Sequence, residues 1–162
     1  MSLLGTWSGG KGETWSKDSS NLLQVLLSIQ SLVMTEGVIY NEPSYSFGKT
    51  NATYIKQDLG YCNIVRYGTV KYAMNDILEH VPVGFEDVIQ KHFYYKKNEI
   101  LKTCQKWLEE AQNPKVTPDY TGLVVSHNYE VANLFTKTKD AYYIELAKEI
   151  EILRTNLNVL NI

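Results

Sequence analysis

The densest run of apolar residues in this chain lies between Leu22 and Met34, where apolar side chains occupy most positions over three helical turns. A helix that is apolar around most of its circumference belongs beneath another layer of structure. A serine or asparagine at residues 19–21 can accept hydrogen bonds from the free amides of the first turn, and Gly37 suits a helix end. The pattern therefore predicts a buried helix between these signals.

Apolar residues recur at helical spacing in three later segments, which are 70–78, 85–111 and 129–135. The stretch 43–60 is rich in glycine and polar residues and predicts a long surface connection. Residues 123–125 are compatible with a short strand or a packed loop. Together these patterns predict a mainly α fold.

The last segment has the most regular spacing. Its apolar residues lie alternately three and four positions apart, in the order Tyr143, Leu146, Ile150, Leu153, Leu157 and Leu160. This is heptad spacing, but the run is shorter than the three to four heptads that indicate a coiled coil. These six residues are a predicted seam, which packs either onto the chain's own body or onto a partner chain.

Composition narrows the classes of function. The 162 residues suffice for one domain with a core. A formal net charge of -2 gives no drive toward nucleic acid or an anionic membrane, so we expect neither as a partner. No run approaches the roughly 18 apolar residues of a membrane span, and the N-terminus does not read as a signal peptide. These features predict a soluble protein of the cytoplasm or nucleus.

The chain has only two cysteines, Cys62 and Cys104, and their separation indicates neither a disulfide framework nor a zinc site. The three histidines have no metal-ligand spacing, so we expect no metal and no cofactor. Cys104 falls among apolar helical positions and is expected to be a small buried side chain. Cys62 is placed at the start of a helix, where the dipole would lower its pKa, but no basic partner is placed beside it.

Several short patterns in this order resemble the ubiquitin-conjugating enzymes, in the large hybrid branch that includes enzymes with BIR repeats. They are the opening Met-Ser-Leu-Leu-Gly-Thr-Trp, Trp15-Ser16, the helix 22–32, Tyr40-Asn41-Glu42-Pro43, and the segments 61–74 and 85–108. The resemblance covers residues 1–111 and implies the helical C-terminal portion of an α+β fold, without its N-terminal helix and four-stranded sheet. Residues 112–162 would then be a helical extension.

The resemblance also implies a chemistry. Conjugating enzymes receive ubiquitin from an activating enzyme as a cysteine thioester and pass it to lysine, usually with a ubiquitin ligase assisting; a thiolate suits this transfer because it is strongly nucleophilic. In the family the catalytic cysteine directly precedes the opening pattern, so the nucleophile is expected immediately before Met1. The chain by itself is therefore expected to be inactive. The alternative is a non-catalytic helical interaction module that dimerises through the seam.

Trp15, Ser16 and Lys17 fall where the family carries its ligase-contacting loop, and they are the residues expected to contact a ligase. The family usually has proline where this chain has Lys17. Proline fixes its backbone angle, so the change alters the expected loop shape.

Without a partner sheet, the helix from Leu22 would expose one apolar stripe. If the stripe amounts to about 400 Å², burial at about 25 cal/mol per Å² represents about 10 kcal/mol. That rivals the net stability of a whole domain. We therefore expect the stripe to be covered by a second copy, by the seam segment or by a rearranged helix, and we expect self-association.

Overall fold

The computed structural model describes residues 4, 5, 8, 10, 13–41, 50–120 and 129–161. The chain forms two compact units, Met1–Lys49 and Thr50–Ile162. Across those described ranges every regular element is a helix, which confirms the mainly α prediction. Most of the opening pattern, Pro43 and residues 123–125 lie outside the described residues.

The first unit contains α1, Leu22–Leu32, and the short 3-10 helix η2, Val38–Asn41. Asn21 caps α1 by accepting from the Gln24 amide, and the Gln24 side chain accepts in return from the Asn21 amide, both at 3.0 Å. Gly37 has a φ of 69°, a backbone conformation that glycine adopts without steric cost. It does not end the helix as expected, because α1 ends at Leu32 with Val33 as its cap.

The second unit begins with three consecutive helical elements, α2 (Ala52–Gly68), the π-helix η4 (Thr69–Asn75) and α3 (Asp76–Glu79). The predicted surface connection over 43–60 was therefore wrong from residue 52 onward. The first turns of α2 are too polar to show an apolar period, but Asn51 caps them by accepting from the Thr53 amide at 2.9 Å.

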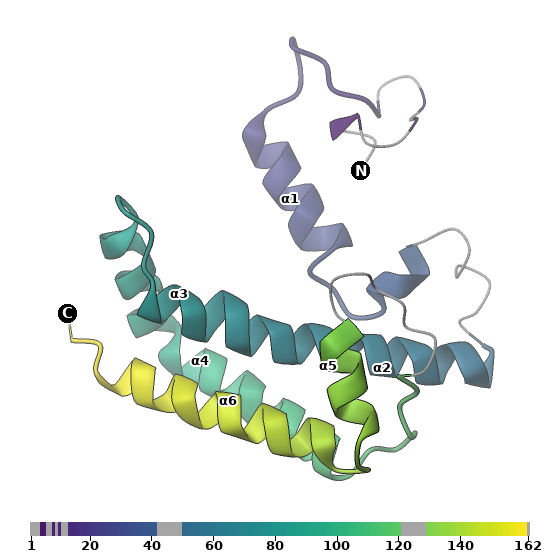
Figure 1. Ribbon diagram of the computed structural model, residues 1–162. Helices are drawn as coiled ribbons and strands as arrows, with labels where there is room; N and C mark the ends of the chain where they lie inside the picture. Colours follow the sequence, from purple (N-terminus) through teal and green to yellow (C-terminus); the bar gives the residue numbers. More distant parts are fainter. Residues whose placement is uncertain are drawn as a thin grey trace. The chain divides into compact units, whose positions relative to one another are not determined.

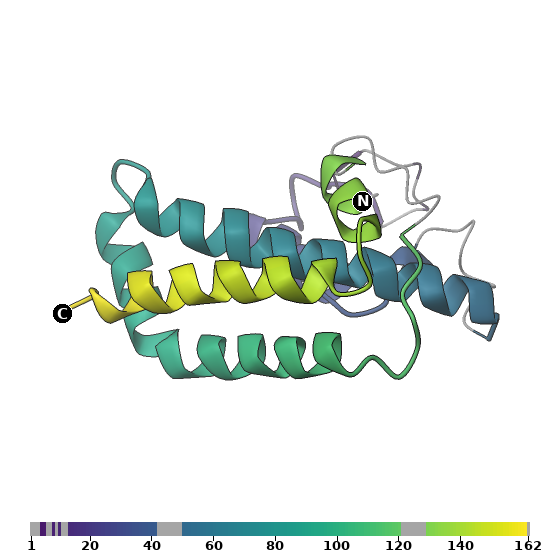
Figure 2. The same ribbon diagram turned by 60° about the horizontal axis from the view of Figure 1, so that its bottom comes forward.

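Three further helices complete this unit. They are α4 (Glu86–Gln112), α5 (Tyr129–Thr136) and α6 (Ala141–Asn158). Gly84, with a φ of 88°, lies in the turn that reverses the chain between α3 and α4. Figures 1 and 2 show α6 alongside both α4 and the α2–η4–α3 segment, while α5 lies across the start of α6.

The core of this unit lies between α6 and its neighbours. Its most buried side chains include Ile64, Val70, Cys104, Leu146, Leu153 and Leu157. An aromatic group closes one end, where Phe135 makes edge contacts with Tyr67, Tyr120 and Tyr142 at centroid distances of 5.2 to 5.5 Å.

A buried polar contact joins the π-helix to α6. Asn75 is only 2% exposed, and its amide donates to the Glu149 carbonyl at 2.9 Å and to the Glu149 carboxylate at 3.0 Å. Asn156 donates to the Asn75 oxygen at 3.5 Å. These bonds link residues more than 70 positions apart, so they fix where α6 lies along the π-helix.

The compact units divide the chain at residue 49, whereas the sequence resemblance divides it at residue 111. The reason for the difference is α6, which packs on α2, η4 and α4 and so joins the later residues to the earlier ones.

Candidate functional site

The predicted ligase loop has a local turn. The Ser16 carbonyl accepts from the Ser19 amide at 3.2 Å and from the Ser20 amide at 2.7 Å. The Ser16 amide donates in return to the Ser20 hydroxyl at 3.0 Å. Lys17 lies within this turn and is exposed, and half of the Trp15 surface is exposed. The three residues are thus adjacent, with the indole and the amine available to a partner.

The Trp15 indole borders a shallow hollow that Leu4, Gly5 and Thr14 also line. Leu4 is 49% exposed, so an apolar side chain lies on each side of the hollow. Aromatic and aliphatic side chains at such a site are suited to contact with another protein.

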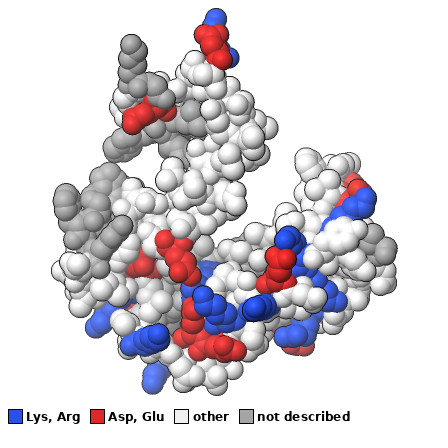
Figure 3. All heavy atoms as spheres, turned by 180° about the vertical axis from the view of Figure 1, so that it is seen from behind, with Lys and Arg blue, Asp and Glu red and all other residues white. Residues whose placement is uncertain are grey.

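The α1 helix has an apolar and almost uncharged surface, which Figure 3 shows as a white region. Seven of its own or immediately following apolar side chains are at least half exposed: Leu22, Leu23, Leu26, Leu27, Leu32, Val33 and Met34. The hydroxyls of Ser28 and Ser31 donate to the carbonyls of Gln24 and Leu27, at 2.7 and 2.8 Å. Within its unit this helix is therefore an uncovered apolar surface.

The predicted seam lies along α6 and just beyond it. Leu146, Ile150, Leu153 and Leu157 are at most 2% exposed, while Tyr143 and Leu160 are half-buried. Their neighbours are α4 and η4 of the same chain. Pairing of two chains through these residues would require this core to open, because the same surface cannot be buried twice.

The two cysteines have different surroundings. Cys104 is fully buried on α4, and burial raises the pKa of its thiol to about 11. Cys62 is half-buried in the middle of α2, so its expected position at a helix start was wrong. Its thiol lies 3.9 Å from an Asp58 carboxylate oxygen.

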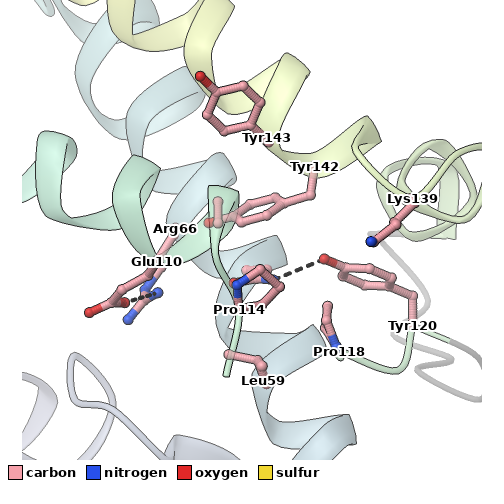
Figure 4. A pocket seen from close by; sticks show the side chains of 11 residues that line it. Leu59, Arg66, Glu110, Pro114, Pro118, Tyr120, Lys139, Tyr142 and Tyr143 are labelled. Atoms are coloured by element: carbon pink, nitrogen blue, oxygen red, sulfur yellow. Dashed lines mark hydrogen bonds and ion pairs between the residues drawn. The ribbon is translucent and has the colours of Figure 1, made fainter. Parts of the chain in front are cut away.

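A pocket lies between α2, the end of α4, the segment 114–120 and the start of α6 (Figure 4). Its cavity measures about 40 Å³. Arg66 on one side pairs with Glu110 at 2.8 Å and lies 5.6 Å from the Trp107 ring centre. The Asp119 amide donates to the Lys56 carbonyl at 2.9 Å, which holds the segment 114–120 on α2.

Two phenols line this pocket. Tyr120 accepts a bond of 2.9 Å from the buried Asn63 amide, which leaves its own proton to donate. Tyr142 is 5% exposed, and its hydroxyl donates to no acceptor within the part of the chain that the structure describes, while Arg66 lies close enough to interact with its oxygen. Burial raises the pKa of Tyr120 to about 12 and that of Tyr142 further, although Arg66 partly opposes the shift at Tyr142. Both phenols are therefore neutral donors at physiological pH.

The sequence did not reveal this pocket, because its residues come from three separated stretches of the chain. The sequence feature that could have indicated a pocket was the presence of two polar side chains, Asn63 and Arg66, within an otherwise packed helix. Among the described residues no cluster of three or more potential metal ligands occurs. No described helix is long and apolar enough to cross a membrane.

No family model matches the chain. It is 40% identical over 111 residues to a probable ubiquitin-conjugating enzyme of Acanthamoeba polyphaga mimivirus, a match that covers 68% of this chain and 8% of that protein. It is 36% identical over 112 residues to the human dual ubiquitin-conjugating enzyme and ubiquitin-protein ligase BIRC6, a match that covers 69% of this chain and 2% of that protein. A probable ubiquitin-conjugating enzyme of Caenorhabditis elegans is 33% identical over 113 residues, a match that covers 70% of this chain and 15% of that protein.

The chain thus spans a small part of each relative. The matches nevertheless extend over most of its own length and agree on one class of protein. About two thirds of this chain is therefore homologous to ubiquitin-conjugating enzymes, which confirms the resemblance seen in its sequence.

Proposed function

We propose that this chain supplies the helical part of a ubiquitin-conjugating domain, and that neither of its two cysteines is the nucleophile. The domain to which it corresponds would transfer ubiquitin from a cysteine thioester to lysine, together with an activating enzyme and a ligase. The observation that carries the proposal is the combination of homology to conjugating enzymes with two thiols in unsuitable surroundings.

The physical reason lies in access and ionisation. A thioester-forming cysteine must reach the terminus of a second protein and must be available as a thiolate. Cys104 has no exposed surface and a raised pKa. Cys62 is half-buried in the middle of α2, which restricts the access of a second protein to its thiol.

The test is a loading assay. Residues 1–162 are incubated with activating enzyme, ATP and ubiquitin and analysed with and without reductant. We expect no reductant-sensitive adduct on this chain, with a conjugating enzyme loaded in parallel as positive control. An adduct that disappears in Cys62→Ser or in Cys104→Ser would refute the proposal.

The loop of Trp15, Ser16 and Lys17 is the proposed ligase contact. An exposed indole beside an exposed amine offers an aromatic anchor with a polar margin, which is common at protein interfaces. Trp15→Ala should weaken binding to a cognate ligase domain by about tenfold or more. Tyr95→Ala removes an even more accessible aromatic side chain, 70% exposed on α4 against 50% for Trp15, and should leave binding unchanged. Equal losses in both variants would refute the assignment of this loop.

A second candidate function is an interaction module that self-associates. The exposed surface of α1 favours it, but the surface involved differs from the predicted seam. Because four seam residues are already buried within one chain, α1 is the proposed contact. Light scattering coupled to size exclusion should show a species larger than a monomer.

A further inference from the structure

The pocket of Figure 4 carries an inference that does not depend on ubiquitin transfer. It is partly enclosed, it has hydrogen-bond donors from several segments, and the proton of the Tyr142 hydroxyl has no acceptor among the described residues. A buried hydroxyl whose proton makes no hydrogen bond is costly, and native structures rarely contain one. The Tyr142 hydroxyl therefore points to an absent acceptor.

The charges that line the pocket indicate the kind of acceptor. Arg66 and Lys139 are positive and Glu110 is negative, which leaves one net positive charge. Arg66 is already paired with Glu110, so Lys139 is the cation that remains for a ligand. A group with a single negative charge balances this pocket, whereas a dianion exceeds it.

The position of α6 adds to this preference. Tyr142 and Tyr143 belong to the first turn of this 18-residue helix, where the backbone dipole favours negative charge. That turn contains no acidic residue, and Asp140 before it makes no capping bond from its side chain. The helix start therefore adds a positive dipole end to the donors around the cavity, and the Asp140 carboxylate offsets part of it.

The size of the cavity limits the ligand. About 40 Å³ admits roughly three water molecules or one small planar group. A carboxylate has two acceptor oxygens, which match the two phenol donors, and one charge, which matches Lys139. In Figure 4 the Tyr120 hydroxyl and the Lys139 amine face the same space.

We propose that this pocket binds a carboxylate, held by Tyr120, Tyr142 and Lys139. The carboxylate is the end group of a small organic acid or of a peptide chain. Asn63 acts as a positioning residue, because its amide orients the Tyr120 hydroxyl so that the phenol proton faces the ligand.

The experiment uses the full chain labelled with ¹⁵N and follows the Asn63 side-chain amide by NMR. Sodium acetate is titrated against sodium chloride at constant ionic strength, and inorganic phosphate is titrated separately. A saturable shift with acetate, absent with chloride and weaker with phosphate, is expected. No saturable shift, or a phosphate response as strong as that to acetate, overturns the proposal.

A second pair of probes separates the two sources of the carboxylate. They are a short peptide with a free C-terminal carboxylate and the same peptide with a C-terminal amide. Binding of the free form alone supports a peptide terminus. Binding of acetate without either peptide supports a small acid. Equal binding of both peptides contradicts recognition of a carboxylate.

Matched variants test the residues. Lys139→Glu and Tyr142→Phe should each weaken acetate binding by about tenfold or more, because each removes a donor to a charged group. Lys137→Glu makes the same charge change on an exposed lysine that does not line the pocket, and Tyr95→Phe makes the same chemical change on an exposed tyrosine. If the control variants weakened acetate binding as much as the pocket variants do, Lys139 and Tyr142 would not be ligand-binding residues.

Discussion

The contact between Asn75 and α6 allows a sharp test of how the second unit is held together. Asn75→Ala removes one bond to a backbone carbonyl and one to a carboxylate. A neutral bond contributes about 1 kcal/mol and a bond to a charged group about 1.5 to 3 kcal/mol. Because the side chain is only 2% exposed, water cannot fully replace it. The free energy of unfolding should fall by about 2 to 4 kcal/mol.

Urea unfolding followed by far-ultraviolet circular dichroism measures this loss. With a slope of about 2 kcal/mol per molar urea, the midpoint should fall by roughly 1 to 2 M while the slope stays unchanged. Asn98→Ala is the control, because it makes the same substitution on an exposed position of α4. It should change the free energy of unfolding by no more than about 0.5 kcal/mol.

A double-mutant cycle with Glu149→Ala then isolates the pair. The two residues share bonds, so the effects of the single variants should not add, and the coupling free energy should exceed about 0.5 kcal/mol. A variant Asn75→Ala as stable as the original chain, or strictly additive effects, would show that the π-helix and α6 are held by apolar packing alone.

Four other predictions concern Tyr142, the two cysteines and α1. Without ligand, Tyr142→Phe should leave the free energy of unfolding unchanged or raise it by up to about 2 kcal/mol, since it removes a buried hydroxyl whose proton has no acceptor among the described residues; a loss in thermal or urea unfolding would contradict this. At pH 8 an alkylating reagent should modify Cys62 before Cys104 in intact-mass analysis, and a faster reaction at Cys104 would contradict its burial. The pKa of Cys104 is higher in the folded chain, about 11 against an ordinary 9.0, so its contribution to stability is complete below pH 9 and is lost towards pH 11; Cys104→Ala should flatten that part of a stability curve. Replacing both Leu26 and Leu27 with Glu should shift light scattering to a monomer, and an unchanged oligomer would exclude α1 as the contact.

The sequence predicted the helices whose apolar residues have a clear period. The helix over 85–111 is α4 within one residue at each end, and the heptad pattern identified α6. The first half of α2 was missed because Lys56, Gln57 and Asp58 interrupt any apolar period. Local pattern also could not predict that η4 would be a π-helix, since its stabilising bonds reach 74 residues ahead to Glu149.

The candidate sites also differ in whether their residues are neighbours in the sequence. The loop at Trp15 could be proposed from the sequence because the resemblance covers adjacent residues. The pocket was missed because Asn63, Tyr120 and Tyr142 meet only after the second unit has folded. Sequence spacing gives no signal for residues brought together from different helices.

The serines of α1 have a consequence for how that helix can be buried. Ser28 and Ser31 direct their hydroxyls to carbonyls of the preceding turn, so these polar groups are already satisfied by the helix itself. Gln30 is different, because it is exposed and lies one helical turn from Leu26 and Leu27. A layer that covers the leucines of α1 therefore has to supply a polar group for the Gln30 amide, but none for these two serine hydroxyls.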